Sequence, residues 1–401
     1  MTMRKLALLL LLTFSQHVCF SADSDGMPII AYGGVPYWQT SEENFRVFSE
    51  CGFNVSLYSY PSLDFLVKAC RQADKYGVKV LGSCPEMTSA PYSTARTLRS
   101  ENGFFGYVMQ DEPTDPEIRI RQQEIESLQT IDTTHVFYIN LMPYYNEKWV
   151  RPSLKVATYG DYLRSASATS CQQISFDHYP VTTEGIRPTW YHNLEMIRNE
   201  SLASGKPFWG FVLSVPHDVP FTAGTYYPTP TLASLRLQVY SNLAYGAQAI
   251  QYFTYWTPPT GDYHYHDAPI SFEGRKTATY SLVQQMNREL KTVATLFYGS
   301  RVVDIQHSGF FIPEGTTRLT KMPTNIQSLT TTGYSGAVVS EIEKDGHRYL
   351  AIVNKSHTQS TKVRIKALND VPRHLTKSLE PKALRSSYTV PPGDVLLFRL
   401  R

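Results

Sequence analysis

The chain has 401 residues, of which 38 are basic and 35 acidic, together with 27 tyrosines and 5 cysteines. This near balance of charge predicts no basic surface for nucleic acid or for an anionic membrane, so neither is expected as a partner. The length exceeds that of one ordinary domain and predicts one large and one small domain.

The first 21 residues have the three-part pattern of a secretory signal. Two basic residues precede an apolar run at 6–14, and the small residues Ser21 and Ala22 follow it. The run is too short to cross a bilayer, and no later stretch is long and apolar enough to do so. We therefore expect an exported protein, periplasmic or extracellular, that begins near residue 22 and has no membrane span. Lipid anchoring at Cys19 is the alternative, although the two residues before it fit such a signal poorly.

Residues 29–299 repeat one unit eight times: a short apolar strand, a loop rich in Pro, Tyr and Gly, and a segment of helical periodicity. The predicted strands are 29–33, 53–57, 78–82, 105–109, 136–139, 173–176, 208–213 and 249–253. Their near-continuous apolar character is typical of parallel strands that are buried on both faces. Eight alternations predict a closed (β/α)₈ barrel, the TIM-barrel fold, over residues 22–299.

Local signals support this assignment. The fourth helix should begin after Thr114, with Pro116 and Glu117 in its first turn. No glycine-rich phosphate loop follows the first strand, which argues against a dinucleotide-binding sheet and gives no reason to expect a cofactor.

The sequence changes character after about residue 300. Strand-like runs at 336–339, 349–353, 362–365 and 395–400 are separated by Gly, Pro, Asn and Asp, without a clear helix. This pattern predicts an antiparallel β-sandwich over residues 300–401, and the lack of a low-complexity linker predicts that it packs against the barrel.

The cysteines after the signal are Cys51, Cys70, Cys84 and Cys171, and none has the spacing of a metal site. We expect buried free thiols, with one disulfide as the alternative in an oxidising compartment.

The active site of such a barrel lies at the carboxyl ends of its strands. Carboxylates, one amide and many aromatic residues follow the predicted strands: Tyr37, Trp38, Tyr58, Glu86, Asp111, Glu112, Asn140, Tyr144, Asp177, Tyr179, His217, Tyr255 and Trp256. Carboxyl groups supply the acid and the second group that glycosidic cleavage needs, and aromatic faces stack on sugar rings. We therefore expect an oligosaccharide or polysaccharide substrate. Glu112 is the predicted general acid, because a carboxyl group enclosed by aromatic residues is desolvated and keeps its proton near neutral pH.

The stretch Phe-Gly-Tyr-Val-Met-Gln-Asp-Glu-Pro at 105–113 resembles the fourth-strand Asn-Glu-Pro motif of clan A glycoside hydrolases. Residues 235–256 are similar to the seventh helix and eighth strand of the same barrels, which often carry a β-sandwich after the barrel. The resemblance implies that Glu112 is the acid/base and that the residue before it contacts a substrate hydroxyl.

Two features depart from that pattern. Asp111 stands where the clan has Asn, and the strand at 208–213 lacks the glutamate that acts as nucleophile in the clan. An Asp-Glu pair also resembles hexosaminidases that use the acetamido group of the substrate, where the Asp orients that group. A third arrangement pairs Glu112 with Asp177 as base or nucleophile, and the separation of the two carboxyl groups distinguishes retention from inversion.

Other interpretations are weaker or come from another class. His217-Asp218 is a poor relay because neighbouring side chains diverge, and residues 264–267 lack a metal-ligand spacing. No serine lies in a nucleophile elbow. A non-catalytic glycan-binding barrel is the rival hypothesis, and a polysaccharide lyase with a Tyr, His or Lys base is a third.

Overall fold

The computed structural model describes residues 26–220, 226–368 and 371–400. The predicted signal at 1–21, including Cys19, lies outside these residues. Within them, no helix combines the length and the apolar character needed to cross a membrane.

Eight parallel strands form a closed barrel. They are β1 (Ile29–Tyr32), β2 (Val55–Ser59), β3 (Lys79–Ser83), β4 (Phe104–Asp111), β5 (Val136–Leu141), β6 (Ile174–Phe176), β9 (Phe208–Leu213) and β10 (Ala249–Phe253). Each pairs with the next along the chain, and β1 pairs with β10 to close the ring. All eight predicted strands and the predicted barrel are confirmed. The interior is filled by apolar side chains such as Ile30, Leu57 and Trp209, so the barrel is a packed core and not a pore.

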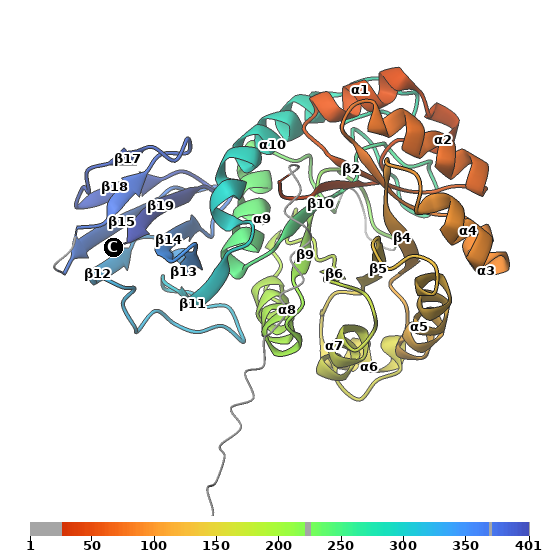
Figure 1. Ribbon diagram of the computed structural model, residues 1–401. Helices are drawn as coiled ribbons and strands as arrows, with labels where there is room; N and C mark the ends of the chain where they lie inside the picture. Colours follow the sequence, from red (N-terminus) through yellow and green to blue (C-terminus); the bar gives the residue numbers. More distant parts are fainter. Residues whose placement is uncertain (1–25, 221–225, 369–370, 401) are drawn as a thin grey trace, which may run out of the picture.

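Helices surround this barrel (Figure 1). They are η1 (Tyr37–Gln39), α1 (Glu42–Glu50), α2 (Leu63–Asp74), α3 (Glu86–Ser89), α4 (Pro91–Leu98), α5 (Asp115–Gln129), α6 (Glu147–Leu154), α7 (Tyr159–Ser167), α8 (Trp190–Ser204), α9 (Leu232–Tyr245) and α10 (Ala278–Phe297). Helix α5 begins as predicted, because the carboxylate of Glu117 accepts hydrogen bonds from the backbone N–H and the hydroxyl of Thr114, at 2.7 and 2.6 Å. A short hairpin, β7 (Val181–Thr182) and β8 (Gly185–Ile186), interrupts the repeat after β6.

The last third of the chain forms two antiparallel sheets. One contains β11 (Arg301–His307), β13 (Ala337–Lys344), β14 (His347–Asn354), β19 (Val395–Leu400), β16 (Arg373–Leu375) and β17 (Pro381–Lys382), and the other contains β12 (Ile326–Thr331), β15 (Thr361–Ala367) and β18 (Ser387–Val390). Alternate residues of both sheets, among them Leu350, Val363 and Phe398, share one apolar core. The predicted sandwich is therefore confirmed.

The sandwich packs against α9 and α10, which stand between it and the barrel (Figure 1). The hydroxyl of Ser340 donates to the carbonyl of Ala244 at 2.7 Å, and the approach is close at Gly393, where an added Cβ would lie 2.1 Å from the carbonyl oxygen of Ala233. Only glycine fits there, since its φ of +67° also lies in the left-handed region.

A cluster of opposite charges joins the two domains. The carboxylate of Glu289 on α10 accepts hydrogen bonds from Arg236 on α9 at 2.9 Å, from Lys377 of the sandwich at 2.9 Å and from the Tyr240 hydroxyl at 3.0 Å. Lys377 also lies 2.9 Å from the carboxylate of Asp394. We call these residues the interdomain charge cluster.

The four cysteines Cys51, Cys70, Cys84 and Cys171 are buried free thiols, as expected. The alternative of a disulfide among them is not realised.

Candidate active site

Three neighbouring strands bring polar side chains into one layer at the carboxyl end of the barrel. Asp111 of β4 is in register with Asn140 of β5, and Asn140 is in register with Ser175 of β6. Residues in register on neighbouring strands point to the same face, so all three face the barrel interior. Asp177 lies two residues beyond Ser175 and therefore faces the same side one layer higher.

The amide of Asn140 connects two of the carboxylates. Its Nδ2 donates to Oδ1 of Asp111 at 3.0 Å and to Oδ1 of Asp177 at 2.9 Å. Its Oδ1 accepts from the hydroxyl of Ser175 at 2.9 Å. This orientation follows from charge, because the amide oxygen would repel the two carboxylates whereas the NH₂ group attracts both.

Asp111 has a second donor on its other oxygen. The hydroxyl of Tyr32, at the end of β1, donates to Oδ2 of Asp111 at 2.8 Å. Both oxygens of Asp111 thus have a protein donor, so the direction of this carboxylate is fixed although it is exposed to solvent.

Glu112 reaches the same centre because the backbone departs from regular strand geometry. The register of β4 against β5 shifts between Val108 and Gln110, which is a β-bulge, and Glu112 has a left-handed φ of 44°. In a regular strand, consecutive side chains point to opposite faces. The bulge determines which residues at the end of β4 face the barrel axis, and the left-handed backbone at Glu112 removes the alternation after Asp111, so that both acids can serve one site.

Glu112 and Asp177 form a carboxyl pair. Each lies close enough to influence the pKa of the other, and Asn140 donates to Asp177 at 2.9 Å. Burial and the nearby charge of Asp111 raise the pKa of Glu112 to about 7. Burial and the charges of Glu112 and Asp111 also raise the pKa of Asp177 well above its usual range. The pair therefore holds one proton near neutral pH, since two adjacent carboxylates cannot both ionise without a large cost.

Aromatic rings enclose this centre on one side. Tyr179 stacks on Phe253 of β10 with ring centres 5.7 Å apart, and Phe253 contacts the ring of Tyr32 at 5.6 Å. These rings limit the access of water to the carboxyl pair and supply faces for a sugar.

A second aromatic group lies at the ends of the first two strands. Trp38 contacts Tyr37 at 4.8 Å and Tyr58 at 6.0 Å between ring centres, and Trp38 is 44% exposed. Their assignment as sugar-stacking residues stays a prediction.

The structure places three of the predicted site residues elsewhere. The carboxylate of Glu86 accepts from the backbone N–H of Leu63 at 3.0 Å, so it satisfies a free donor in the first turn of α2. Tyr255 is fully buried against Phe48 and Phe53, between the barrel and its helices. Trp256 is 4% exposed, and its indole donates to the carbonyl of Phe272.

Two other predicted residues occupy loops of the barrel mouth without contacting the carboxyl pair. Tyr144 packs on His192, with ring centres 5.1 Å apart. His217 is buried between the rings of Tyr227 and Tyr265, and burial lowers its pKa to about 4, so it is neutral at physiological pH.

The end of the seventh barrel strand carries no carboxylate within the described residues. Ser214 follows β9 and donates its hydroxyl to the carbonyl of Thr254 at 2.9 Å. Asp218, farther along that loop, lies 3.5 Å from Nδ1 of His264.

No group of three or more His, Cys, Asp or Glu side chains in the described ranges is arranged to hold a metal ion.

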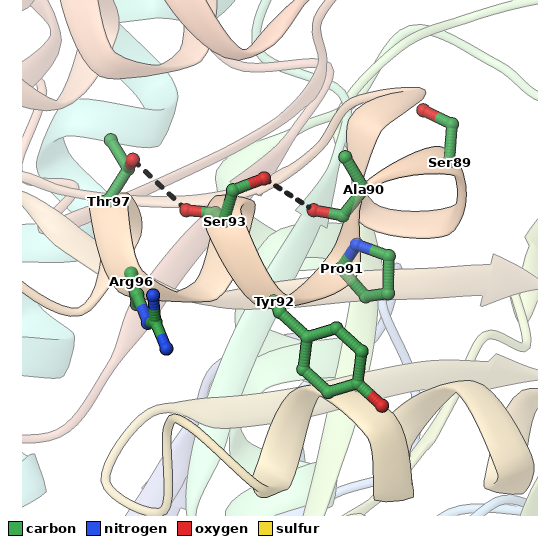
Figure 2. A pocket seen from close by; sticks show the side chains of 7 residues that line it. All are labelled: Ser89, Ala90, Pro91, Tyr92, Ser93, Arg96 and Thr97. Atoms are coloured by element: carbon green, nitrogen blue, oxygen red, sulfur yellow. Dashed lines mark hydrogen bonds between the residues drawn. The ribbon is translucent and has the colours of Figure 1, made fainter.

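A shallow depression lies elsewhere on the surface, along α4 (Figure 2). Its lining residues are Ser89, Ala90, Pro91, Tyr92, Ser93, Arg96 and Thr97. None of them is a carboxylate, and Ser93 and Thr97 return their hydroxyls to backbone carbonyls of the same segment, each at 3.1 Å. This depression offers no acid or base, in contrast to the barrel mouth.

Sequence reasoning missed Tyr32, Phe253 and Arg187 near the mouth. Tyr32 and Phe253 are the last residues of β1 and β10, whereas the prediction considered only residues that follow a strand. The available signal was an aromatic residue at the last position of the predicted strand 249–253 and at the last but one of the predicted strand 29–33. Arg187 follows the hairpin after β6, which nothing in the repeat predicted.

Comparison with known proteins concerns the family and the fold. The sequence profile of a family described as β-galactosidase matches residues 118–293. That range includes Asn140 and Asp177 but begins after Asp111 and Glu112. A search of curated proteins found no match.

Solved structures share the fold. A β-galactosidase from Bacillus circulans sp. alkalophilus has a TM-score of 0.65 at 10% identity, over 94% of this chain and 100% of that one. A glycoside hydrolase family 5 protein from Bacteroides vulgatus has a TM-score of 0.59 at 11% identity, over 93% and 88%. The chain spans 60% of the length of a β-galactosidase from the psychrophilic Marinomonas ef1, which covers 67% of this chain at 10% identity and a TM-score of 0.48. The chain resembles clan A (β/α)₈ barrels, and the family match together with this fold indicates a glycoside hydrolase.

Proposed function

We propose that the protein is an exported glycoside hydrolase in which Glu112 is the general acid/base and Asp177 is the second catalytic carboxylate. The observation that carries this proposal is the Glu112–Asp177 pair, two neighbouring buried carboxyl groups at the mouth of the barrel whose pKa values are both raised. Glycosidic cleavage requires one protonated and one ionised carboxyl group beside the scissile bond, and the pair provides both.

The surrounding donors divide the two roles. Burial and the charges of Glu112 and Asp111 raise the pKa of Asp177, while the hydrogen bond from Asn140 at 2.9 Å acts in the opposite direction. We assign the proton to Glu112 because the resemblance of residues 105–113 to the fourth-strand motif of clan A hydrolases implies that role. Glu112 would protonate the leaving oxygen, while Asp177 would attack or stabilise the anomeric carbon. Asp111 accepts from Tyr32 and Asn140 and would bind a sugar hydroxyl or the acetamido group of an N-acetylated sugar.

The proximity of the two carboxyl groups favours retention of configuration. Inverting hydrolases keep their carboxyl groups roughly 6.5 to 9.5 Å apart to hold a water molecule, whereas retaining ones use about 5 to 5.5 Å. Since Glu112 and Asp177 influence each other's pKa, the shorter, retaining separation suits the pair, and Asp177 would act as nucleophile.

Replacement of Glu112 by Gln tests the proposal. The amide keeps the size of the side chain but cannot give up a proton, so we expect kcat on a panel of aryl and natural glycosides, including β-galactosides, to fall at least about 100-fold. Glu126→Gln on the outer face of α5 is the matched control and should retain activity. A folded Glu112→Gln variant with undiminished release of reducing sugar would refute the assignment.

A non-catalytic glycan-binding barrel is the second candidate, favoured by the absence of a carboxylate at the end of β9. In that case the wild-type protein would bind glycans without releasing sugar, and Glu112→Gln would leave the affinity unchanged. Activity confined to N-acetylated sugars that persists in Asp177→Asn would instead assign the nucleophile to the substrate.

Export is part of the proposal and is tested separately. We expect the chain expressed with residues 1–21 to appear outside the cytoplasm with a new N-terminus near residue 22. N-terminal sequencing of the fractionated protein measures this, and an intact Met1 in the cytoplasmic fraction would refute it.

A further inference from the structure

The hairpin after β6 carries an arginine into the space between three strand-end loops. The backbone N–H of Arg187 donates to the carbonyl of Pro180 at 2.8 Å, which ties the residue to the end of the Asp177 segment. Its guanidinium carbon lies 4.9 Å from the ring centre of Tyr145, 5.3 Å from that of Tyr226 and 5.4 Å from that of Tyr227. The loops after the fifth, sixth and seventh barrel strands thus meet at one cation, and we call this group the arginine cage.

The arginine cage contains no anion. Arg187 donates to the hydroxyl of Tyr227 at 2.7 Å, but no carboxylate in the described ranges forms an ion pair with it, and its Nε–H has no hydrogen-bond partner there. The partly buried Arg236, by contrast, is paired with Glu289. Because withdrawing a cation from water is costly, a partly buried guanidinium without a counterion is a ready site for an oxyanion.

The cage adjoins the carboxyl pair. Tyr227 contacts the ring of Tyr179 at 6.1 Å, and burial together with the nearby charge of Asp177 raises the pKa of both tyrosines. On the other side, Tyr145 contacts the ring of His178 at 5.3 Å. Tyr179, Tyr227 and Tyr145 therefore connect Arg187 with the segment that carries Asp177, so the guanidinium lies beside the proposed cleavage site.

We propose that Arg187 is the anion-binding residue of a sugar subsite, and that the substrate is an acidic glycan carrying a carboxylate or sulfate group beside the bond that is cleaved. The inference rests on the glycoside hydrolase function proposed above. A neutral sugar needs no cation here, whereas an acidic sugar would be repelled by Asp111, Glu112 and Asp177 unless a positive charge offset them. The planar guanidinium suits carboxylate and sulfate oxygens, and the tyrosine faces suit the sugar ring.

Binding to matched acidic and neutral sugars tests the proposal. Isothermal titration would compare a galacturonate trisaccharide with a galactose trisaccharide, and galactose 6-sulfate with galactose, on the wild-type protein and on Glu112→Gln. We expect at least one acidic probe to bind about 10-fold or more tightly than its neutral counterpart in both proteins, and 0.5 M NaCl to reduce that preference. Preference for the uronate would identify a carboxylate, and preference for the sulfate ester would identify a sulfate.

Arg187→Met should abolish this preference while leaving neutral sugars bound as before, and Arg187→Lys should retain part of it. Arg385→Met is the matched control, because Arg385 also lies over a tyrosine, Tyr388, at 5.9 Å but within the sandwich. The proposal would be overturned if the wild-type protein bound acidic and neutral probes with equal affinity, or if Arg187→Met lost the same affinity for both. Because the experiment measures binding, and does so on Glu112→Gln as well, it tests the anion site even if the protein hydrolyses no glycoside.

Discussion

The interdomain charge cluster predicts a pH-dependent contribution to stability that can be measured at Glu289. Burial raises the pKa of this carboxyl group, but hydrogen bonds from Arg236 and Lys377 outweigh burial and lower it from 4.5 to about 2. A difference of about 2.5 pH units between the unfolded and folded states corresponds to about 3 kcal/mol. Because the folded pKa is the lower one, this stabilisation is complete above the unfolded value of 4.5 and is lost as the pH falls toward 2.

Glu289→Gln removes the charge and keeps the shape. We expect the free energy of unfolding to fall by up to about 3 kcal/mol at pH 7, since Arg236 and Lys377 then have only Asp394 as a counterion. The difference from the wild-type protein should shrink as the pH is lowered from 5 toward 3.

Urea unfolding at several pH values measures this, and two probes separate the domains. All five tryptophans precede residue 300, so their fluorescence reports the barrel, whereas circular dichroism reports both domains. Glu380→Gln is the control, because Glu380 and Lys382 form an exposed pair 3.3 Å apart, and such pairs contribute less than about 1 kcal/mol. A loss that stays equal at pH 7 and pH 4, or no loss at all, would refute the reasoning.

Two further predictions concern the site. Asp111→Asn removes a negative charge that raises the pKa of Glu112, so the alkaline limb of the kcat/KM profile should move to lower pH by on the order of 1 pH unit. An alkaline limb that stays in place between pH 4 and pH 9 would contradict this prediction. Tyr32→Phe deletes the donor to Asp111 and should lower kcat/KM about 10- to 100-fold, the equivalent of roughly 1.5 to 3 kcal/mol. Tyr107→Phe loses the same kind of bond, to Asp132 at 2.7 Å away from the mouth, and steady-state kinetics should show no comparable fall.

The fold could be predicted because each barrel strand is buried on both faces and is therefore apolar along its whole length. Residues 208–213, for example, are buried without exception. The start of α5 was equally predictable, since a threonine with a glutamate three residues later is a local signal that needs no tertiary contact.

The site was only partly predictable. The expectation that site residues follow the barrel strands gives their position along the chain but not the direction in which each side chain points. It located Asp111, Asn140 and Asp177, which belong to strands whose register makes them neighbours. It misplaced Tyr255, because Tyr252 and Tyr255 both pack on Phe53 while Phe253 takes the place at the mouth. Glu86 accepts a hydrogen bond from the first turn of α2, because a carboxylate after a strand satisfies a helix as readily as it binds a substrate.

The bulge in β4 bears on how relatives of this protein should be recognised. The extra residue near Met109 turns Asp111 toward the barrel axis, and the left-handed backbone at Glu112 brings the next acid to the same centre. A barrel with the same Asp-Glu-Pro letters but a regular fourth strand would direct its second acid toward the helices. Relatives with the same activity should therefore have a fourth strand of the same length. In an alignment, a deletion of one residue within 104–111 is a stronger sign of a different activity than a substitution of Asp111.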